Sequence, residues 1–440
     1  MATIVPFRGI RYNQTKAGQL VDLVTPPYDV INSDEQKRYY EKNSYNIIRL
    51  EYGESHTSDD GQNNRYTRAR SFFTAWLEQH ILVHEEQPAI YLYEQEFAIS
   101  GSRLTRSGFI AGIGVEEYQT GVILPHEETL SKAKADRLEL LRHCHANFSP
   151  IFGLYDDSTL TVEKIASYYK QNSANVAFTD ENGESHRLWI ITNPNDLATI
   201  TALFKDLKVY IADGHHRYET ALNFHKEMLA KGDSRFSFCL MTLVNLHDPG
   251  LVIYPTHRLV KNVTGFSAKE FLENLRKIFT VTALTLPEKD RETILTTELN
   301  ANTALISDNH AFLLYLGGDK LYRLILKRAA DNQLMAAGRS TFSPAWRSLD
   351  VAVLQSLVLE GMLGIDKEKR AGGTNLAYTR EEADALNRVD SGEFQAVIYL
   401  NPTRVREVTE VAAAGDKMPQ KSTYFYPKLI TGLVINDFTV

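Results

Sequence analysis

Residues 208–222, near the middle of the chain, join an apolar segment to a cluster of side chains that could bind an anion. Lys208 to Ala212 is apolar and β-prone after its lysine, as in a short buried strand. Gly214 permits a sharp turn. From His215 onward the apolar positions recur at helical spacing. The pattern therefore predicts a strand, a tight turn and a helix in direct succession.

The first turn of this predicted helix carries two histidines and an arginine. Free backbone N–H groups and the positive end of the helix dipole favour an anion there. Arg217 adds a planar fork suited to phosphate, and Asp213 is suited to a magnesium ion or a substrate proton. We expect a phosphate site at Asp213, Gly214, His215, His216 and Arg217, with Asp213 and His216 catalytic and Asp213 the metal ligand.

A purely structural interpretation of the same run also exists. Asp213 would then only cap the helix, His215 and His216 would lie on the surface, and Arg217 would pair with a nearby carboxylate. An isolated Asp-Gly pair would favour this interpretation. The His-His-Arg sequence that follows within one turn favours the phosphate site.

The run from Asp213 to Ala221 resembles the nucleotide-binding signature of the ParB/sulfiredoxin superfamily. The free serine kinases of that superfamily, with an Asp-Gly-His-x-Arg form, are the closest match. The resemblance implies an α/β fold with a mixed-sheet ParB/sulfiredoxin-like core and additional α+β segments. It also implies Mg²⁺ as cofactor, ATP, ADP or pyrophosphate as phosphoryl donor, and L-serine as acceptor.

The whole chain further resembles a long, uncharacterised prokaryotic family that is often encoded near serine-biosynthesis genes. That gene context favours a serine kinase. The resemblance is carried by five segments: Pro26 to Ile31, Leu124 to Glu127, Ser149 to Gly153, Ala212 to Tyr218, and Met418 to Phe425.

A second candidate for chemistry follows an apolar run that Pro125 ends. His126 and Glu127 are then expected to project from a strand end, His126 toward substrate. Phosphorylation of an alcohol needs a group that accepts or orients the hydroxyl proton, and a carboxylate is a common choice. Glu127 is the predicted base, with Glu128 as the fallback. The alternative is a solvated acidic loop.

Two lysines near the C-terminus flank a hydroxyl- and aromatic-rich stretch, residues 422–427. Lys421 and Lys428 could close over an anionic ligand, Lys421 on the phosphate and Lys428 on the substrate. Exposed lysines on a terminal strand are the alternative. Tyr28 and Asp29 are candidate substrate contacts, although the prolines before them also suit a structural turn.

Composition restricts the class of protein. The 440 residues carry a net charge of -7, which argues against a general nucleic-acid binder. Cys144 and Cys239 fit no metal-ligand spacing, and a reduced protein is the simpler expectation than a disulfide. The N-terminus has no signal-peptide pattern, and no segment approaches the length of a membrane helix. We therefore expect a cytoplasmic protein.

We expect three regions: residues 1–120 as an N-terminal α+β region, 121–265 as the phosphate-binding core, and 266–440 as a C-terminal α/β region with a closing loop. At the level of single elements, the patterns predict a strand over Tyr45 to Tyr52, hairpin strands over Ile90 to Phe97 and Thr105 to Val115 joined around Ser100 and Gly101, a helix from Asp350 through Leu363, and a closing strand over Leu429 to Ile435.

The resulting hypothesis is a magnesium-dependent small-molecule kinase that converts free L-serine to O-phosphoserine. Its expected partners are the substrate and the phosphoryl donor, without nucleic acid or membrane, and a homodimer is left open. Two other classes stay open. One is a ParB-like regulatory protein that binds nucleotide. The other is a phosphohydrolase in which His215, His216 and Asp213 hold a metal that activates water.

Overall fold

The computed structural model describes the 440 residues apart from 100, 130, 306–309, 328 and 440. The contacts within the chain divide it into two compact units. Unit 1 comprises Met1–Pro125, Thr129–Val252 and Pro427–Val440, and unit 2 comprises His126–Glu128 and Ile253–Tyr426. The three regions expected from the sequence, with borders near residues 120 and 265, remain a prediction about domains.

Unit 1 is built on a nine-stranded mixed sheet with the order β6-β11-β8-β12-β5-β4-β10-β9, to which β1 adds by pairing with β5. Two of its pairs, β6 with β11 and β8 with β12, are parallel, whereas the other pairs are antiparallel. A mixed α/β fold is therefore confirmed. The strands of the sheet are β1 (Ile4–Val5), β4 (Ile90–Ile99), β5 (Ser102–Gly114), β6 (Ile123–Leu124), β8 (Ile151–Tyr155), β9 (Val176–Thr179), β10 (Ser185–Ile191), β11 (Val209–Asp213) and β12 (Phe238–Asn245).

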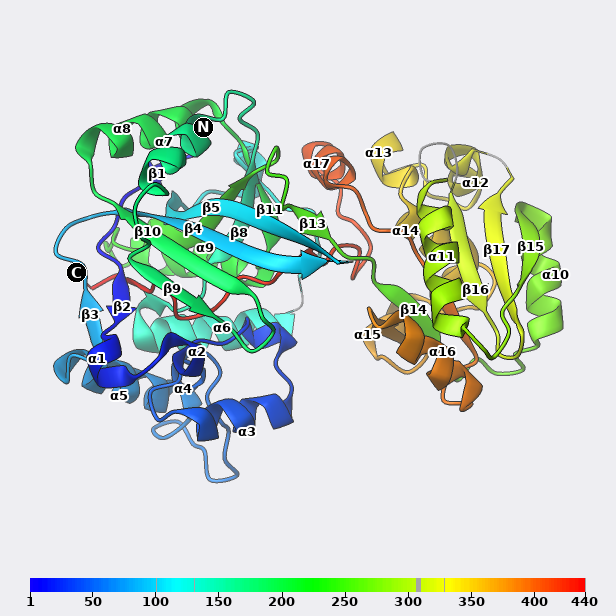
Figure 1. The fold of residues 1–440 in the computed structure, drawn as a ribbon, viewed down its shortest axis with the longest axis horizontal. Helices are drawn as coiled ribbons and strands as arrows, with labels where there is room; N and C mark the ends of the chain where they lie inside the picture. The colour runs from blue at the N-terminus through cyan, green and yellow to red at the C-terminus, as the bar shows by residue number, and fades with distance from the viewer. Residues whose placement is uncertain (100, 130, 306–309, 328, 440) are drawn as a thin grey trace. The chain divides into compact units, whose positions relative to one another are not determined.

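Helices and short ladders complete unit 1 (Figure 1). The short ladders pair β2 (Ile10–Tyr12) with β3 (Leu82–His84), and β7 (Ala146–Asn147) with β21 (Asn436–Asp437). The helices are α1 (Gln14–Ala17), α2 (Leu20–Leu23), α3 (Ser33–Lys42), α4 (Ile48–Glu51), α5 (Arg65–Glu78), α6 (Ser131–Cys144), α7 (Thr161–Tyr169), α8 (Pro194–Leu203) and α9 (His215–Leu229), with 3-10 turns at Tyr28–Val30, Tyr118–Thr120 and Phe204–Asp206.

The main core of unit 1 covers one face of the sheet, because successive strand side chains point to opposite faces. Cys239, Met241 and Leu243 of β12 belong to this core, and residues of α7, α8 and α9 pack onto it. The opposite face carries polar side chains as well, among them Gln95 of β4 and Arg106 of β5, both fully buried. Burial of both faces explains why these strands are predominantly apolar.

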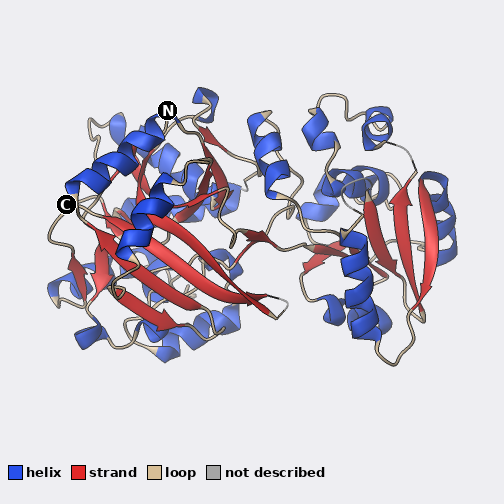
Figure 2. Cartoon of the chain, turned by 45° about the horizontal axis from the view of Figure 1, so that its top comes forward, coloured by secondary structure: helices blue, strands red, loops and turns tan. Residues whose placement is uncertain are grey.

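Unit 2 contains a six-stranded, fully antiparallel sheet with the order β15-β17-β16-β19-β14-β18. Helices flank its strands, as Figure 2 shows. The strands are β14 (His257–Val260), β15 (Phe279–Thr285), β16 (Ala311–Tyr315), β17 (Lys320–Leu326), β18 (Leu376–Thr379) and β19 (Ala396–Tyr399). The helices are α10 (Ala268–Ile278), α11 (Arg291–Thr303), α12 (Ala330–Ala336), α13 (Pro344–Arg347), α14 (Asp350–Val353), α15 (Lys367–Ala371), α16 (Glu382–Asp390) and α17 (Val405–Ala413), with a π-helical segment at Leu354–Glu360. A short ladder, β13 (Val252–Ile253) with β20 (Phe425–Tyr426), completes the strands of the chain.

The predicted strand over Tyr45 to Tyr52 is wrong, because Ile48–Glu51 forms helix α4. The buried side chain of Asn46 accepts a hydrogen bond from the Ile48 amide and donates to the Asp22 carbonyl oxygen, at 2.9 and 2.7 Å. These tertiary contacts start a helical turn in a segment whose residues favour a strand.

The closing strand predicted over Leu429 to Ile435 is also wrong. This segment forms only isolated bridges, Thr25 with Thr431 and Ile10 with Ile435. Gly432 between them has a φ of +90°, which interrupts an extended strand. The apolar character of the segment reflects burial within unit 1 instead of sheet pairing.

Two other element predictions are confirmed with changes. The hairpin of β4 and β5 is present, with Gly101 at φ +80° in its turn, and Ser100 lies outside the described residues. The helix that begins at Asp350 becomes a π-helix from Leu354 onward.

Cys144 and Cys239 are both buried and form no disulfide. Burial raises the pKa of the Cys144 thiol to about 12. Among the described residues, no helix combines the length and apolar character that crossing a membrane requires.

Gly153 of β8 should be a sensitive position in the sheet, because a Cβ built there would lie 2.5 Å from the Met241 sulfur and 2.9 Å from a Val209 methyl. We expect Gly153→Ala to destabilise the protein by about 1–3 kcal/mol through overpacking. Chemical denaturation measures this change. Gly61→Ala is the matched control, because nothing lies within 4 Å of its Cβ position. Equal stabilities of the two variants would contradict the packing described here.

Candidate functional site

The strand, tight turn and helix predicted around Gly214 are confirmed. Strand β11 ends at Asp213, Gly214 follows with a φ of +89°, and α9 begins at His215. A left-handed φ favours glycine. A Cβ at this position would also lie 3.0 Å from the Arg217 guanidinium, so any other residue would crowd the arginine side chain.

The Asp213 carboxylate lies between two cations. Lys428 Nζ donates to Oδ1 at 2.9 Å, and Arg217 Nη2 donates to Oδ2 at 3.1 Å. Burial by itself would raise the pKa of Asp213, but the charges of Lys428 and Arg217 outweigh it and lower the pKa to about 2. Asp213 is therefore ionised at neutral pH, and the three side chains together carry one net positive charge.

One part of the purely structural interpretation of residues 213–217 is confirmed. Arg217 pairs with the Asp213 carboxylate, and its Nη1 donates to the Pro150 carbonyl oxygen at 2.5 Å. The other two parts of that interpretation differ from the structure, because the Asp213 side chain does not cap α9 and His215 is buried. Arg217 is thus held in position by bonds within unit 1, and its charge lies beside the first turn of α9.

Lys428 reaches Asp213 from the C-terminal tail, which crosses the polar face of the sheet. The buried Arg106 donates to the Pro427 carbonyl oxygen at 2.6 Å, and Gln95 donates to the Lys428 carbonyl oxygen at 3.0 Å. Burial lowers the pKa of Arg106 to about 10, so this guanidinium remains charged at neutral pH. These two hydrogen bonds anchor the tail next to Lys428, the lysine that pairs with Asp213.

Tyr28 and Asp29 lie in the 3-10 turn Tyr28–Val30. The Arg137 guanidinium lies over the Tyr28 ring, 4.0 Å from its centroid. Burial raises the pKa of Tyr28 to about 12, against the opposing charges of Arg137 and Arg217. Burial also lowers the pKa of His216, while the Asp29 carboxylate acts in the opposite direction. His216 is accordingly a neutral imidazole at pH 7.

Sequence reasoning missed Glu51 and Ser149, which line a cavity of about 40 Å³ together with Arg137 and Arg217. This volume suits one or two water molecules. Ser149 Oγ donates to Glu51 at 2.8 Å, and burial raises the pKa of the Glu51 carboxyl. Ser149 stands in one of the segments that carry the family resemblance, whereas Glu51 was hidden by the incorrect strand prediction.

His126 and Glu127 belong to unit 2. His126 is fully buried, and its Nε2 lies 2.9 Å from Thr423 Oγ1. The His126 carbonyl oxygen accepts a hydrogen bond from the Met418 amide at 2.7 Å. Glu127 and Met418 form an isolated parallel β-bridge. His126 therefore positions the segment after Met418, and Glu127 stays half-buried beside it.

Lys421, also in unit 2, is exposed and has a φ of +58°. The buried Arg258 donates to the Lys421 carbonyl oxygen at 3.2 Å, and Thr403 donates to the Ser422 carbonyl oxygen at 2.7 Å. Unit 2 thus brings His126, Glu127 and the Lys421 segment together, whereas Tyr28, Asp29, the Asp213–Arg217 turn and Lys428 all belong to unit 1.

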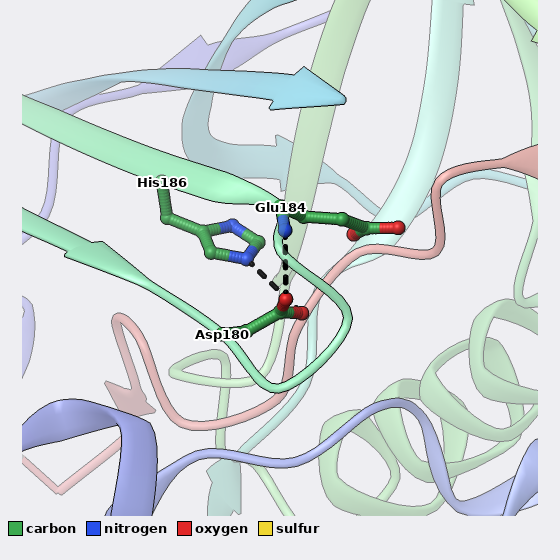
Figure 3. Close-up of side chains that lie close together, drawn as sticks. All are labelled: Asp180, Glu184 and His186. Atoms are coloured by element: carbon green, nitrogen blue, oxygen red, sulfur yellow. Dashed lines mark hydrogen bonds and ion pairs between the residues drawn. The ribbon is translucent and has the colours of Figure 1, made fainter. Parts of the chain in front are cut away.

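A separate group of potential metal ligands lies in the β9–β10 hairpin. Within the described residues, Asp180, Glu184 and His186 each offer a ligand atom within 4.8 Å of the others. Figure 3 shows the Asp180 carboxylate accepting from the Glu184 amide at 2.9 Å and facing His186 Nε2 at 3.5 Å. The Asp180 carboxylate is thus engaged by contacts within the hairpin itself. Asp213 is not among its members.

Solved structures with overlapping folds include a free serine kinase variant in complex with AMP, at 14% identity and a TM-score of 0.34, covering 72% of this chain and 86% of the other. A conserved hypothetical protein from Pyrococcus furiosus overlaps at 15% identity and a TM-score of 0.31, covering 73% and 92%. C-terminally truncated SbnI from Staphylococcus aureus overlaps at 12% identity and a TM-score of 0.34, covering 74% and 87%. Overlaps at this level do not establish an activity for this chain.

No curated protein matches the chain. A family described as protein of unknown function (DUF1015) matches residues 4–352, which include both the Asp213–Arg217 turn and the Glu127 segment. The chain belongs to the DUF1015 family.

Proposed function

We propose that this protein is a phosphotransferase that transfers a phosphoryl group to the hydroxyl of a small metabolite, with free L-serine as the first acceptor to test. The observation that carries the proposal is the cationic charge cluster at the N-terminus of α9. Asp213 is ionised there between Lys428 and Arg217, beside a left-handed turn at Gly214.

The charge and the backbone of this turn suit a phosphate group. Two cations and one carboxylate lie at the start of α9, whose backbone hydrogen bonds begin with the Tyr218 amide donating to the Gly214 carbonyl oxygen, and the positive end of the helix dipole favours an anion there. The resemblance of Asp213 to Ala221 to the ParB/sulfiredoxin signature supports a nucleotide or pyrophosphate as the source of that phosphate.

Asp213 serves in this proposal as an internal anion that keeps Lys428 and Arg217 in place until the phosphate binds. Because Lys428 and Arg217 each donate to one of its oxygens, their positive charges disfavour a Mg²⁺ ion at Asp213 in this arrangement.

The remaining proposed roles are proton transfer, substrate contact and charge neutralisation. His216 is neutral at pH 7 and can accept a proton near the phosphate. Tyr28 and Asp29 are proposed to contact the substrate, as is His126. Glu127 is proposed as the group that orients the acceptor hydroxyl, and Lys421 as a charge that offsets the transferred phosphate.

The central experiment measures consumption of ATP, ADP and pyrophosphate with serine and related alcohols as acceptors. We expect one donor–acceptor pair to react, and Asp213→Asn to lower kcat/KM about 10²-fold or more, because loss of the carboxylate releases both cations. Asp156→Asn, at an exposed carboxylate paired with His247, is the control and should match wild type. A failure of every pair to react would end the kinase proposal, and donor consumption without any acceptor would favour a phosphohydrolase.

Lys428→Met should reveal the ion pair in the pH dependence of stability. The folded pKa of Asp213 is about 2, below its ordinary 3.8, so its contribution is present above pH 4 and is lost as the pH falls toward 2. We expect the variant to be less stable at pH 7 by about 1–3 kcal/mol, allowing for partial exposure, with the difference narrowing in acid. Urea denaturation at several pH values tests this.

The control for that series is Lys231→Met, which removes an exposed lysine paired with Glu227 on α9. It should change stability by less than about 0.5 kcal/mol at any pH. A pH-independent difference between wild type and Lys428→Met would contradict the charge interaction with Asp213.

Glu127 and its fallback Glu128 can be separated by substitution. If Glu127 is the base, Glu127→Gln lowers kcat about 10²–10⁴-fold with a smaller change in KM. Glu128 pairs with the exposed Lys367 at 3.2 Å, so Glu128→Gln should leave kcat within about twofold. Steady-state kinetics with the reactive donor–acceptor pair measure kcat and KM of both variants. A larger loss of kcat in Glu128→Gln than in Glu127→Gln would assign the role of base to Glu128.

A further inference from the structure

Unit 2 contains a cavity of about 360 Å³, and of the residues with a role in the proposed phosphotransfer only the fallback Glu128 lines it. Its volume falls within the range of small-molecule sites. One wall is aromatic, another is cationic, and a third is the π-helical segment Leu354–Glu360, which contributes Gln355 and Glu360. Short π-helical segments occur frequently at functional sites because they displace side chains from the regular helical register.

The aromatic wall is formed by Phe342 and Trp346, whose rings are stacked with centroids 4.0 Å apart and planes 16° apart. Trp346 is buried, and its Nε1 donates to the Lys417 carbonyl oxygen at 2.9 Å. This bond fixes the indole and, through the stack, the half-buried Phe342. A planar ring in the cavity would find a rigid apolar surface.

The cationic wall has more positive than negative charge. Arg339 and Arg370 both bond to the single carboxylate of Glu360, Arg370 at 2.6 Å. Arg339 Nε also donates to Ser356, and Arg370 Nη1 also donates to the Ile365 carbonyl oxygen. Within the described part of the chain, Arg339 Nη1 and Arg370 Nη2 make no hydrogen bond, so two donors remain for an anion.

The other charges of the lining do not cancel this excess. The lining has four basic residues, Arg339, Lys367, Arg370 and Lys417, and three acidic ones, Glu128, Glu360 and Asp366, so it carries one net positive charge. Lys367 pairs with Glu128 at 3.2 Å. From this arrangement we propose that the cavity binds a small planar aromatic anion. Its ring lies against Phe342, and its carboxylate or phosphate lies on Arg339 and Arg370.

Isothermal titration calorimetry on the full chain tests this assignment with four probes. Indole-3-acetate carries a ring and a carboxylate, AMP carries a ring and a phosphate, and indole-3-ethanol and adenosine are their neutral counterparts. At least one of the two anions should bind with one-to-one stoichiometry and at least about tenfold more tightly than its neutral counterpart. The anion that binds identifies the acidic group. If neither anion binds, the proposal is overturned.

Two substitutions locate the binding. Arg370→Gln and Phe342→Leu should each weaken the bound anion about tenfold or more, while thermal melts confirm that the variants are folded. Arg388→Gln is the matched control, because it removes another arginine of unit 2 that pairs with a glutamate, Glu393, and it should bind as wild type does.

Asp213→Asn separates this cavity from the proposed phosphate site. AMP binding that falls in Asp213→Asn and persists in Arg370→Gln belongs to unit 1 and counts against the proposal. Loss in Arg370→Gln with retention in Asp213→Asn supports it, whether or not the chain transfers phosphate.

Discussion

An ionised carboxylate held between two cations organises the candidate site of unit 1. Asp213 accepts from Arg217 four residues ahead and from Lys428, which is 215 residues away in sequence. An ion pair of this kind, largely shielded from water, is stronger than one on an exposed surface, and loss of one partner leaves the other charge without compensation. The position of the turn, the conformation of Arg217 and the path of the C-terminal tail are therefore coupled through one side chain.

The chain path shows how this coupling arises. The chain leaves unit 1 after Val252 and re-enters it at Pro427, so the whole main segment of unit 2 lies between Asp213 and Lys428 in sequence. Arg106 and Gln95, on the polar face of the sheet, then bind the carbonyl oxygens of Pro427 and Lys428. Of these two side chains, Arg106 has the higher free-energy cost of burial, because a buried guanidinium needs hydrogen bonds to compensate for its lost hydration.

In unit 2, arginine and histidine side chains likewise hold a chain segment in place through hydrogen bonds. Arg258 and His126 hold the segment that carries Lys421 through carbonyl and hydroxyl oxygens. Arg339 and Arg370 share one carboxylate beside a stacked aromatic pair. Both units thus contain a site where two basic side chains share one carboxylate: Arg217 and Lys428 in unit 1, and Arg339 and Arg370 in unit 2. A chain with an overall charge of -7 thus concentrates cations where small anions could bind.

Local patterns in the sequence by themselves determined the strand, the glycine turn and the helix around Gly214, because apolar runs, a permissive residue and helical spacing act within a few residues. They also determined the mixed α/β class. Only the tertiary structure decided which cations meet Asp213, that Glu51 and Ser149 line a cavity beside Arg217, that Ile48–Glu51 is helical, and that the helix after Val353 becomes a π-helix. These features depend on contacts between residues far apart in the chain, and on burial that changes a local preference, so no pattern within a short window contains them.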